Sequence, residues 1–449
     1  MDIFLFITQL LVVLGCIVMG TRSSGVGLGL WGGTGVAVLV FVFGLAPGSP
    51  PVDALLIVLS VVLASSMMQA AGGIDWMVSI AAKVISKNPK QITLIAPLTA
   101  FLFSVGAGTS NILYPLLPVI YDLSYRNGIR PSRPLSLSVV STGVALACSP
   151  VSAAMAAMIA LTDTAPWNFE LMDIIKVTLP AAIVGIFLAS LFVRRLGKDI
   201  EDDPEIQALI ASGKLVAPGA TATEVKAEVT VTKEGRWAAI IFLLGVLAIV
   251  IFGLFSGLRP LGAGEDPQPI SMTPIIEIIM FVAGTLIMLV AKPKVAEIPT
   301  MTVFRAGMVS AIALFGLAWL TNTFLGEHST LVSEGIGGLV DTAPWIFALG
   351  VFLVCVLTTS QSTATNSIVP IGLAAGIPLG LMSGMWAGAF AGIYLLPTNG
   401  SQIAAANFDE SGSTKLGTKL VDHSFFLPTL ILAVSTIAAG SLFGILWGG

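Results

Sequence analysis

The sequence alternates long apolar stretches with short polar connections. Ten stretches approach the length of about 20 largely apolar residues that a membrane-spanning helix needs. They lie at residues 3–20, 26–45, 54–72, 135–161, 174–193, 237–256, 274–291, 306–324, 381–406 and 425–446. The pattern predicts an all-α polytopic membrane protein with about ten transmembrane helices.

Two further apolar stretches, 92–121 and 344–373, are interrupted by polar residues and glycine, so that neither arm of the first reaches spanning length. Irregular backbone at membrane depth is tolerated only where it is buried in protein or lines a wet cavity. We interpret both as re-entrant hairpins that enter from opposite sides. Residues 74–87 alternate with helical periodicity and predict an interfacial amphipathic helix, as do 327–341.

Lysine and arginine are distributed very unevenly. The 449 residues are 55% hydrophobic and 10% charged, with net charge −4 and mean hydropathy +0.96, so charge is confined mainly to loops. If both termini lie outside and both hairpins re-enter, all but two of the 21 basic residues face inside, Lys176 and Arg259 being the exceptions. Because basic loops stay cytoplasmic, both termini are predicted to be periplasmic.

The two halves of the chain repeat the same order of elements in opposite orientation, which is typical of inverted-repeat transporters. Residues 1–193 form the first repeat, with scaffold helices in 3–72, hairpin 92–121, broken helix 135–161 and helix 174–193. Residues 194–236 are polar and predict a cytoplasmic linker, partly disordered. Residues 237–449 form the second repeat, with scaffold helices in 237–324, hairpin 344–373, broken helix 381–406 and helix 425–446.

Local sequence supports the repeat. TSNILYPLLPVI (109–120) matches QSTATNSIVPIG (361–372), with Pro118 opposite Pro370. Downstream, Pro150 and Pro397 occupy similar positions in the two helices that we predict to be broken near the membrane midplane. These matches indicate four polar breaks, at Gly106–Asn111, Cys148–Ser152, Thr358–Asn366 and Pro397–Gln402.

The four breaks are predicted to converge on one binding site. A helix that restarts after a break offers free N–H groups and a positive dipole end, which suit a carboxylate, and a helix that ends there offers carbonyls, which suit Na⁺. The candidate substrate-binding residues are Gly108, Thr109, Ser110, Asn111, Ser149, Pro150, Ser152, Ser360, Gln361, Ser362, Thr363, Thr398, Asn399, Gly400 and Ser401. A sodium ion would lie near Ser110, Cys148, Ser362 and Pro397.

Other chemistry is poorly represented. His328 and His423 are expected in solvated loops, and the spans contain no His/Cys/Asp cluster, so an enzyme and a resident cofactor are not expected. Arg126, Arg130 and Arg133 follow the first hairpin. They either attract anionic substrates or only mark the inner side.

The chain resembles the anaerobic C4-dicarboxylate uptake (Dcu) family over nearly its whole length. The resemblance is carried by GLGLWGG (27–33), APGSPPVD (46–53), QAAGGIDWM (69–77), KNPKQITLIAP (87–97), GAGTSN (106–111), LPVIYD (117–122), IRPSRPLS (129–136), SPVSAA (149–154) and HSFFLPT (423–429). It implies a bacterial inner-membrane carrier that exchanges fumarate, malate, succinate and aspartate.

The breaks are also similar, more distantly, to those of the divalent-anion:sodium symporters. Matching on the hairpin prolines places Gly108–Ser110 and Ser360–Ser362 on the tips, without the asparagine of that motif. This second resemblance implies a homodimer and an elevator-type motion.

We therefore expect antiport of C4-dicarboxylates, driven or accompanied by Na⁺ or H⁺ if an ion is coupled. The alternatives are a cation-coupled dicarboxylate symporter or exporter and, less well supported, an anion channel. Lipid and small dicarboxylates are the expected partners and nucleic acid is not, and 194–236 is the expected surface for a cytoplasmic sensor partner.

Overall fold

The computed structural model describes residues 3–23, 26–163, 167–218, 231–263, 267–418 and 421–447, without the side chains at 3, 21, 22, 54, 325 and 329–342. In this part of the chain the structure is helical, and its β pairing is the isolated bridge between Leu261 and Pro269. The all-α class predicted from the sequence is confirmed.

The first half of the chain contains nine α-helices and two 3₁₀ turns. They are α1 (Ile3–Ser23), α2 (Gly27–Phe41), α3 (Val52–Ala70), α4 (Gly73–Ser86), η1 (Pro89–Gln91), α5 (Ile92–Ala107), η2 (Ser110–Leu116), α6 (Leu117–Arg126), α7 (Ser132–Ala145), α8 (Ala153–Thr162) and α9 (Leu171–Val193).

The rest of the chain begins with the connecting elements η3 (Ile200–Asp202) and α10 (Pro204–Ala211). It continues with α11 (Lys233–Leu254), η4 (Ser256–Leu258), α12 (Met272–Ala291), η5 (Val295–Thr300), α13 (Thr302–Thr342), α14 (Trp345–Thr358), α15 (Gln361–Ala374), α16 (Leu379–Ala389), η6 (Phe390–Tyr394), α17 (Gly400–Phe408) and α18 (Phe426–Trp447).

Six helical stretches of the described chain have the length and composition to cross a membrane. They are Pro89–Ala107, Leu171–Val193, Lys233–Leu254, Met272–Ala291, Thr302–His328 and Phe426–Trp447. The stretch Pro89–Ala107 combines η1 and α5 and is the first arm of the predicted first hairpin. It is longer than the sequence predicted for this arm. The predicted spans 135–161 and 381–406 are each divided into separate helices by their polar breaks.

Two segments were predicted as interfacial helices, and they differ in outcome. α4 forms within one residue of the predicted 74–87, and the chain bends by 75° between α3 and α4. Gly72, with φ +82°, provides the left-handed residue at this bend. Residues 327–341 are not a separate element, because α13 continues through them from Thr302 to Thr342.

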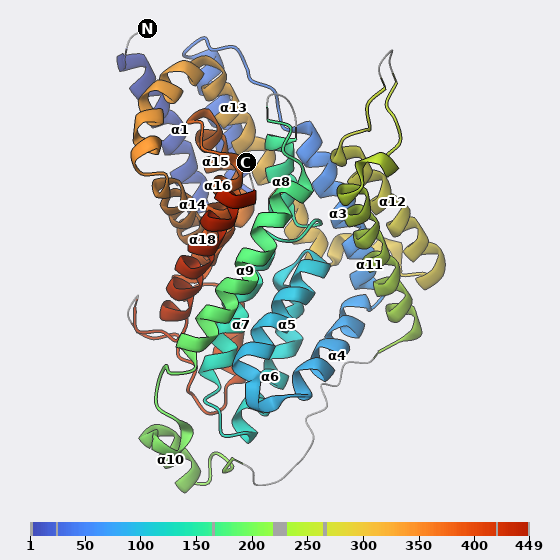
Figure 1. Cartoon of the computed structure of the whole chain (residues 1–449), viewed down its shortest axis with the longest axis vertical. Helices are drawn as coiled ribbons and strands as arrows, with labels where there is room; N and C mark the ends of the chain where they lie inside the picture. Colours follow the sequence, from blue (N-terminus) through green and yellow to red (C-terminus); the bar gives the residue numbers. More distant parts are fainter. Residues whose placement is uncertain are drawn as a thin grey trace.

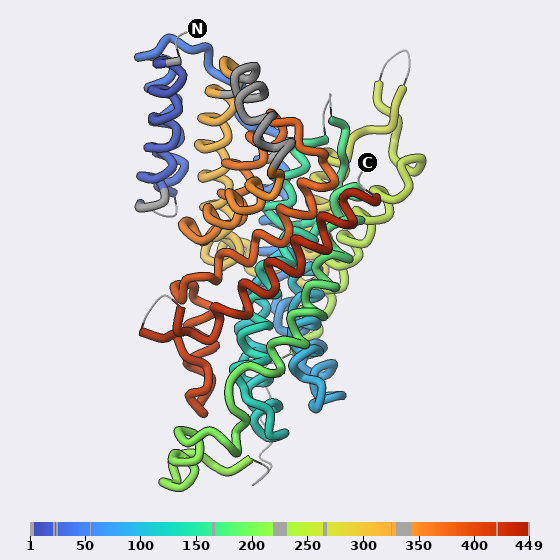
Figure 2. The backbone as a smooth tube through the Cα atoms, turned by 60° about the vertical axis from the view of Figure 1, so that its left-hand side comes forward, coloured from blue at the N-terminus to red at the C-terminus, as the bar shows by residue number. Residues whose placement is uncertain are grey.

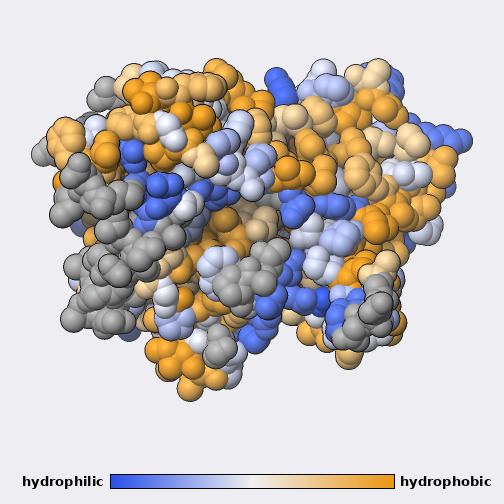
Figure 3. Space-filling model, turned by 90° about the horizontal axis from the view of Figure 1, so that it is seen from above, coloured by the Kyte–Doolittle hydropathy of each residue, from blue (hydrophilic) through white to orange (hydrophobic). Residues whose placement is uncertain are grey.

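The helices pack around one extensive apolar core. α16, α18 and α9 lie side by side, α3 packs against α12, and α1 and α2 form a pair that packs on α13 at one edge (Figures 1 and 2). The N- and C-termini both lie toward the end of the molecule opposite to α10 (Figure 1). Seen from the end that carries the termini, apolar side chains cover much of the outer rim and hydrophilic ones gather between them (Figure 3).

Both histidines are buried, so the expectation that they are solvated is wrong. His328 is fully buried within α13, where Nε2 meets Oε1 of Gln9 and the ring lies edge-on to Phe6. His423 is buried with Nε2 at 2.9 Å from the carbonyl oxygen of Leu395. The polar residues around each histidine indicated an exposed side chain. The burial could not be inferred from them, because the partners Gln9 and Leu395 lie far away in the sequence.

Close helix crossings depend on glycine. At the crossing of α2 and α13, a Cβ atom added to Gly32 would lie 2.3 Å from the carbonyl carbon of Gly316. At the crossing of α16 and α18, a Cβ added to Gly384 would lie 2.1 Å from the carbonyl oxygen of Gly440. Small residues let helix backbones approach this closely in membranes, so these glycines determine the spacing of the helices.

The pair Gly32 and Gly33 tests this dependence within one turn of α2. Gly32→Ala should lower stability by about 1–3 kcal/mol because the added methyl group overpacks the contact. Gly33→Ala is the matched control, because its Cβ would meet nothing within 4 Å. Thermal unfolding of the purified protein in detergent should give a lower melting temperature for Gly32→Ala than for Gly33→Ala. Equal melting temperatures would show that α2 and α13 can move apart to accommodate the methyl group without loss of stability.

Candidate functional site

The tip of the first hairpin is a helix end followed at once by a helix start. α5 is capped at its C-terminal end by Gly108, which has φ +68° and donates its N–H to the carbonyl of Ser104 at 2.9 Å. Thr109 is extended, and its Oγ1 accepts the N–H of Asn111 at 3.2 Å, which caps the start of η2. The backbone groups freed by the turn are therefore partly satisfied by the tip itself.

Gly108 also places the tip against the first broken helix. A Cβ atom at this position would lie 2.4 Å from the carbonyl oxygen of Val151, between α7 and α8. Positive φ and this close approach both require glycine. Hairpin and broken helix therefore meet at Gly108 and Val151.

The second hairpin repeats this geometry with different residues. α14 ends at Thr359, which has φ +50° and donates its N–H to the carbonyl of Cys355 at 2.9 Å. Ser360 is extended and caps α15 by accepting the N–H of Thr363 at 3.2 Å. Thr359 thus corresponds to Gly108, whereas matching on the prolines placed Ser360 there. The prediction is wrong by one residue because the first return arm begins as a 3₁₀ helix, which rises about 2.0 Å per residue instead of 1.5.

The two broken helices restart in a similar way. Ser152 is extended and its Oγ accepts the N–H of Met155 at 3.0 Å, which caps α8. Asn399 is extended and its Oδ1 accepts the N–H of Ser401 at 3.1 Å, which caps α17. Gln402 completes this cap by accepting the N–H of Asn399 at 3.1 Å.

A cavity of about 230 Å³ lies where both hairpin tips meet the first broken helix. On one side it is lined by the two tips and by the start of α8; on the other it is lined by α3 and α13. The polar side chains that line it are Ser65, Thr109, Ser110, Asn111, Ser310, Thr359, Ser360, Gln361 and Ser362. Among the described residues of this lining none carries a charge.

The cavity brings together seven of the fifteen candidate residues. These are Gly108, Thr109, Ser110, Asn111, Ser360, Gln361 and Ser362. Ser149, Pro150 and Ser152 belong to the second break and Thr363 to the first turn of α15, but at the second break the residues in contact with the cavity are Leu146, Val151, Ala153 and Ala154. The two tips therefore meet at one cavity, but not all four breaks reach it, and the role of the tips in binding stays a prediction.

The fourth break does not line this cavity. Gly400 lies beside Tyr114 of η2, so that a Cβ on Gly400 would be 2.9 Å from the tyrosine hydroxyl. Ser401 Oγ donates to Asn399 Oδ1 at 2.9 Å, and the side-chain amide of Gln402 donates to the carbonyl oxygen of Tyr394 at 2.9 Å. Thr398 and Asn399 precede these residues in the same turn. The fourth break thus lies beside the return arm of the first hairpin and is held to the buried Tyr394 through Gln402.

The cavity suits an anion without containing a cationic side chain. The first amides of a helix have no partner within it, and the starts of α8 and α15 line the cavity. Their positive dipole ends favour negative charge. No group of three or more His, Cys, Asp or Glu residues that could hold a metal occurs in the described chain. Of the four residues expected near a sodium ion, Ser110 and Ser362 line the cavity, whereas Cys148 and Pro397 do not. The sodium site stays a prediction.

Sequence reasoning missed several cavity residues. Ser65 and Ser310 lie within predicted spans that lack a break, and Thr359 lies inside the predicted third break but was not among the candidate residues. Ala153 and Ala154 have no polar side chain and line the cavity at the start of α8. Ser65, in the pair with Ser66, and Thr359, in the predicted break, carry a sequence signal that could have been followed.

Part of the predicted linker is folded onto the end of α6 and the start of α7. Arg130 pairs with Asp203 and donates to the carbonyl of Lys198 at 2.9 Å, and Arg133 donates to the carbonyl of Leu196 at 2.8 Å. The hydroxyl of Tyr125 donates to the carbonyl of Val216 at 2.8 Å. These arginines therefore bind the linker, whereas the sequence suggested only substrate attraction or a topology signal; residues 219–230 lie outside the described part.

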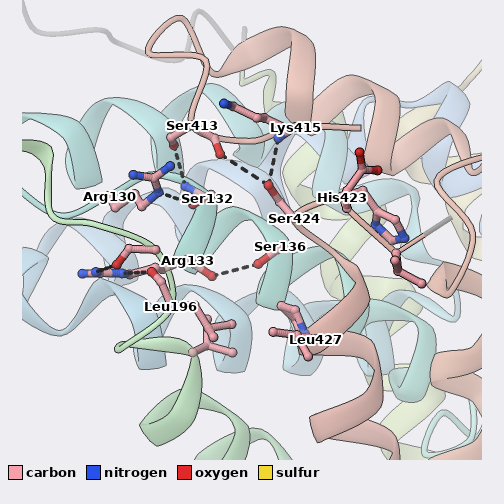
Figure 4. Close-up of a pocket in the computed structure, with 15 residues that line it drawn as sticks. Arg130, Ser132, Arg133, Ser136, Leu196, Ser413, Lys415, His423, Ser424 and Leu427 are labelled. Atoms are coloured by element: carbon pink, nitrogen blue, oxygen red, sulfur yellow. Dashed lines mark hydrogen bonds between the residues drawn. The ribbon is translucent and has the colours of Figure 1, made fainter. Parts of the chain in front are cut away.

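A second cavity, of about 310 Å³, lies beside this contact (Figure 4). Arg130, Ser132 and Ser413 lie together on one wall, where the N–H of Ser132 donates to Ser413 Oγ at 3.0 Å. Lys415, from the loop before α18, pairs with Glu205 of α10. Residues 194–218 thus contact both the start of α7 and the loop between α17 and α18.

The contact with Arg130 favours the ionised form of Asp203. Burial opposes its charged form, but the hydrogen bonds from Arg130 and from the amides of Glu205 and Ile206 outweigh burial and lower the pKa of this carboxyl. The side chains of Asp203 and Arg130 are each only 11% exposed, so solvent screens the pair weakly.

A polytopic helical protein in which two hairpin tips and a broken helix enclose an uncharged polar cavity has the construction of a membrane transporter. Residues 5–448 match the family of anaerobic C4-dicarboxylate membrane transporters, and the chain belongs to this family. The family resemblance found in the sequence is confirmed, and so is its consequence that the protein is a transporter and not an enzyme.

Named relatives cover almost the whole chain. The anaerobic C4-dicarboxylate transporter DcuB of Escherichia coli is 36% identical over 450 residues, which cover 99% of each chain. The C4-dicarboxylate transporter DcuA of Wolinella succinogenes is 31% identical over 437 residues, covering 97% of this chain and 98% of the relative.

Two solved structures share the fold. The YdaH transporter of Alcanivorax borkumensis superposes with a TM-score of 0.60 at 13% identity, covering 98% of this chain and 97% of the other. MtrF of Neisseria gonorrhoeae gives a TM-score of 0.52 at 12% identity, covering 92% and 84%. At this identity they indicate the fold alone.

The pair Asp202 and Asp203 tests the docking of the linker. Asp203→Asn should raise hydrogen–deuterium exchange of α10 at pH 7 about tenfold or more, because a hydrogen bond to a charged group contributes about 1.5–3 kcal/mol. Asp202→Asn is the control, because this neighbour is exposed. With a lowered pKa, Asp203 stabilises docking above the ordinary carboxyl pKa of about 3.9, and this contribution is lost as pH falls through the lowered value. Unchanged exchange in Asp203→Asn would contradict this role.

Proposed function

We propose that the protein exchanges C4-dicarboxylates, including fumarate, succinate, malate and aspartate, across the bacterial inner membrane. The observation that carries this proposal is the uncharged polar cavity at the meeting point of both hairpin tips. A dianion in a water-poor site needs many hydrogen-bond donors, and hydroxyls, amides and helix N-termini supply them here. The names of the relatives support the substrate class.

The position of the cavity favours an alternating-access mechanism of the elevator type. Most of its polar side chains belong to the two hairpin tips, whereas the facing wall, from α3 and α13, is largely apolar and includes Val58, Val62 and Val303. Substrate therefore lies at the boundary between two groups of helices. Sliding of the polar group along the apolar wall would carry the substrate without breaking its contacts.

Several further features belong to this proposal. Both termini would be periplasmic and 194–236 cytoplasmic, since the termini and α10 lie at opposite ends of the molecule (Figure 1). The inverted repeat is supported by the equivalent tips at Gly108 and Thr359 and the equivalent caps at Ser152 and Asn399. A homodimer and a sensor partner at the linker follow from the sequence expectations.

The alternative is a cation-coupled symporter or exporter, and one transport assay distinguishes it from an exchanger. Proteoliposomes loaded with succinate should take up labelled fumarate without an ion gradient, and empty ones should not. Uptake that requires an imposed Na⁺ or H⁺ gradient, with no stimulation by internal succinate, would favour the symporter. Linear dependence of the rate on concentration, without saturation, would favour a channel.

Ser362 and Ser367 provide a matched pair on α15. Ser362→Ala should raise the KM for fumarate exchange about tenfold, because the hydroxyl lines the cavity and a hydrogen bond to a charged group contributes about 1.5–3 kcal/mol. Ser367→Ala should leave KM unchanged, because its hydroxyl is buried without a hydrogen-bond partner in the described structure. An unchanged KM in Ser362→Ala at normal expression removes that hydroxyl from the site.

A further inference from the structure

Arg259 is one of the two basic residues that the topology prediction places outside, and the structure buries it. Its side chain is only 3% exposed and lies directly after η4, in the connection between α11 and α12. Nη1 donates to Oε1 of Glu170 at 2.7 Å, and Nη2 donates to Oε2 at 2.5 Å. Glu170 immediately precedes α9. The two side chains therefore form a bidentate ion pair between the end of α11 and the start of α9.

Each partner of this ion pair is anchored to its own helix. Nε of Arg259 donates to the carbonyl of Phe252, in the last turn of α11, at 2.9 Å. The N–H of Glu170 donates to the carboxylate of Asp173, in the first turn of α9, at 3.1 Å. Because N–H···O bonds weaken beyond about 3.2 Å, a shift of one helix end past the other breaks the paired hydrogen bonds.

Two further contacts join the same helix ends. Thr273 Oγ1, in the first turn of α12, lies 3.3 Å from Asp163 Oδ2 at the end of α8. A Cβ atom added to Gly253 of α11 would lie 2.7 Å from Cγ of Met172 in α9. The ends of α8 and α9 thus contact α11 and α12 toward the end of the molecule that carries the termini (Figure 1).

These contacts connect the two groups of helices between which the substrate cavity lies. α8 begins at the cavity, and α9 packs against α5 and α7, which lead into the first tip and the second break. α12 packs against α3, a helix of the apolar wall, and α11 packs against α12. Sliding of one group along the other would therefore pull the ion pair apart.

A buried ion pair suits a contact that has to open and re-form. Such a pair is often no more stabilising than well-packed apolar residues of similar volume, whereas its bidentate geometry is satisfied in only one arrangement. The side chain of Glu170 is 31% exposed, so water can hydrate the carboxylate as the pair separates. Arg259 retains the carbonyls of Phe252 and Gly253 as acceptors when Glu170 leaves.

We propose that Glu170 and Arg259 form a latch that holds the two groups of helices in their present arrangement and opens in every transport cycle. The inference rests on the proposed exchange by sliding of the polar group. Both residues lie outside the described lining of the cavity. The latch therefore acts on the movement of the helices and not on contact with substrate.

A disulfide between the two groups tests whether this contact opens. The sulfur of Met172→Cys would take the place of Met172 Cγ, 2.7 Å from the Cβ atom of Gly253→Cys, within reach of an S–S bond of about 2.05 Å. Oxidation of the double variant should abolish counterflow of labelled fumarate, and a reductant should restore it. Full exchange by the cross-linked protein would overturn the proposal.

The matched control is a disulfide within one group of helices. A Cβ atom on Gly284 of α12 would lie 3.9 Å from Cβ of Ala64 in α3, close to the separation of about 3.8 Å that is typical of disulfides. Oxidised Ala64→Cys combined with Gly284→Cys should retain exchange, because both helices belong to the group with the apolar wall. Loss of exchange in this control as well would contradict sliding between the two groups.

Glu170→Gln tests whether the ion pair keeps the contact closed, because it preserves the size of the side chain and removes its charge. The thiol of Met172→Cys should react with N-ethylmaleimide about tenfold faster or more in this background, the change expected when a hydrogen bond between charged groups is lost. Glu297→Gln is the matched control, because its exposed pair with Lys294 lies within a single connection. Equal labelling rates with and without Glu170→Gln would overturn the latch.

The labelling assay needs no transport, so it separates the latch from the proposed function. If Glu170→Gln fails to fold, Glu170→Asp withdraws the carboxylate from Arg259, and an unchanged labelling rate in that variant overturns the latch. Absence of exchange in the unsubstituted protein, together with faster labelling in Glu170→Gln, would refute dicarboxylate exchange and leave the latch in place.

Discussion

The structure depends on how backbone hydrogen bonds are satisfied at helix interruptions that lie out of contact with water. Every break frees N–H and C=O groups that cost several kcal/mol when left unpaired in a membrane. All four breaks use one solution, an extended residue whose side chain caps the next helix: Thr109, Ser152, Ser360 and Asn399. Because each cap satisfies its own turn, polar backbone can remain inside the protein around a small cavity.

The two tips reach the same conformation at different cost. Gly108 adopts its left-handed backbone without strain and lets Val151 approach closely. Thr359 adopts a similar conformation although it is β-branched, which costs about 1–2 kcal/mol. Strain of this kind persists only where the surroundings enforce it and is concentrated at functional sites. Its occurrence on the cavity wall agrees with a binding role for the second tip.

Much of the architecture is predictable from the sequence, because apolar length and interruption by Gly, Pro, Ser and Thr determine where helices start and stop. The tips and broken helices were located in this way. The left-handed Thr359 was not predictable, since propensity alone argues against it. The burial of His328 against Gln9 and the docking of Arg130 on Asp203 depend on residues far away in the chain. Local patterns carry no information about such pairs.

The capping pattern also changes which groups can hold a substrate. A side-chain oxygen that accepts a backbone N–H, as in Thr109 and Ser360, has part of its capacity occupied by its own turn. The groups that remain are the first amides of the capped helices and the polar side chains just after each cap. This explains why Ala153 and Ala154 line the cavity beside Ser110 and Gln361. Recognition would then rest largely on backbone amides at fixed positions, which select a ligand by the spacing of its two carboxylates more than by the group between them.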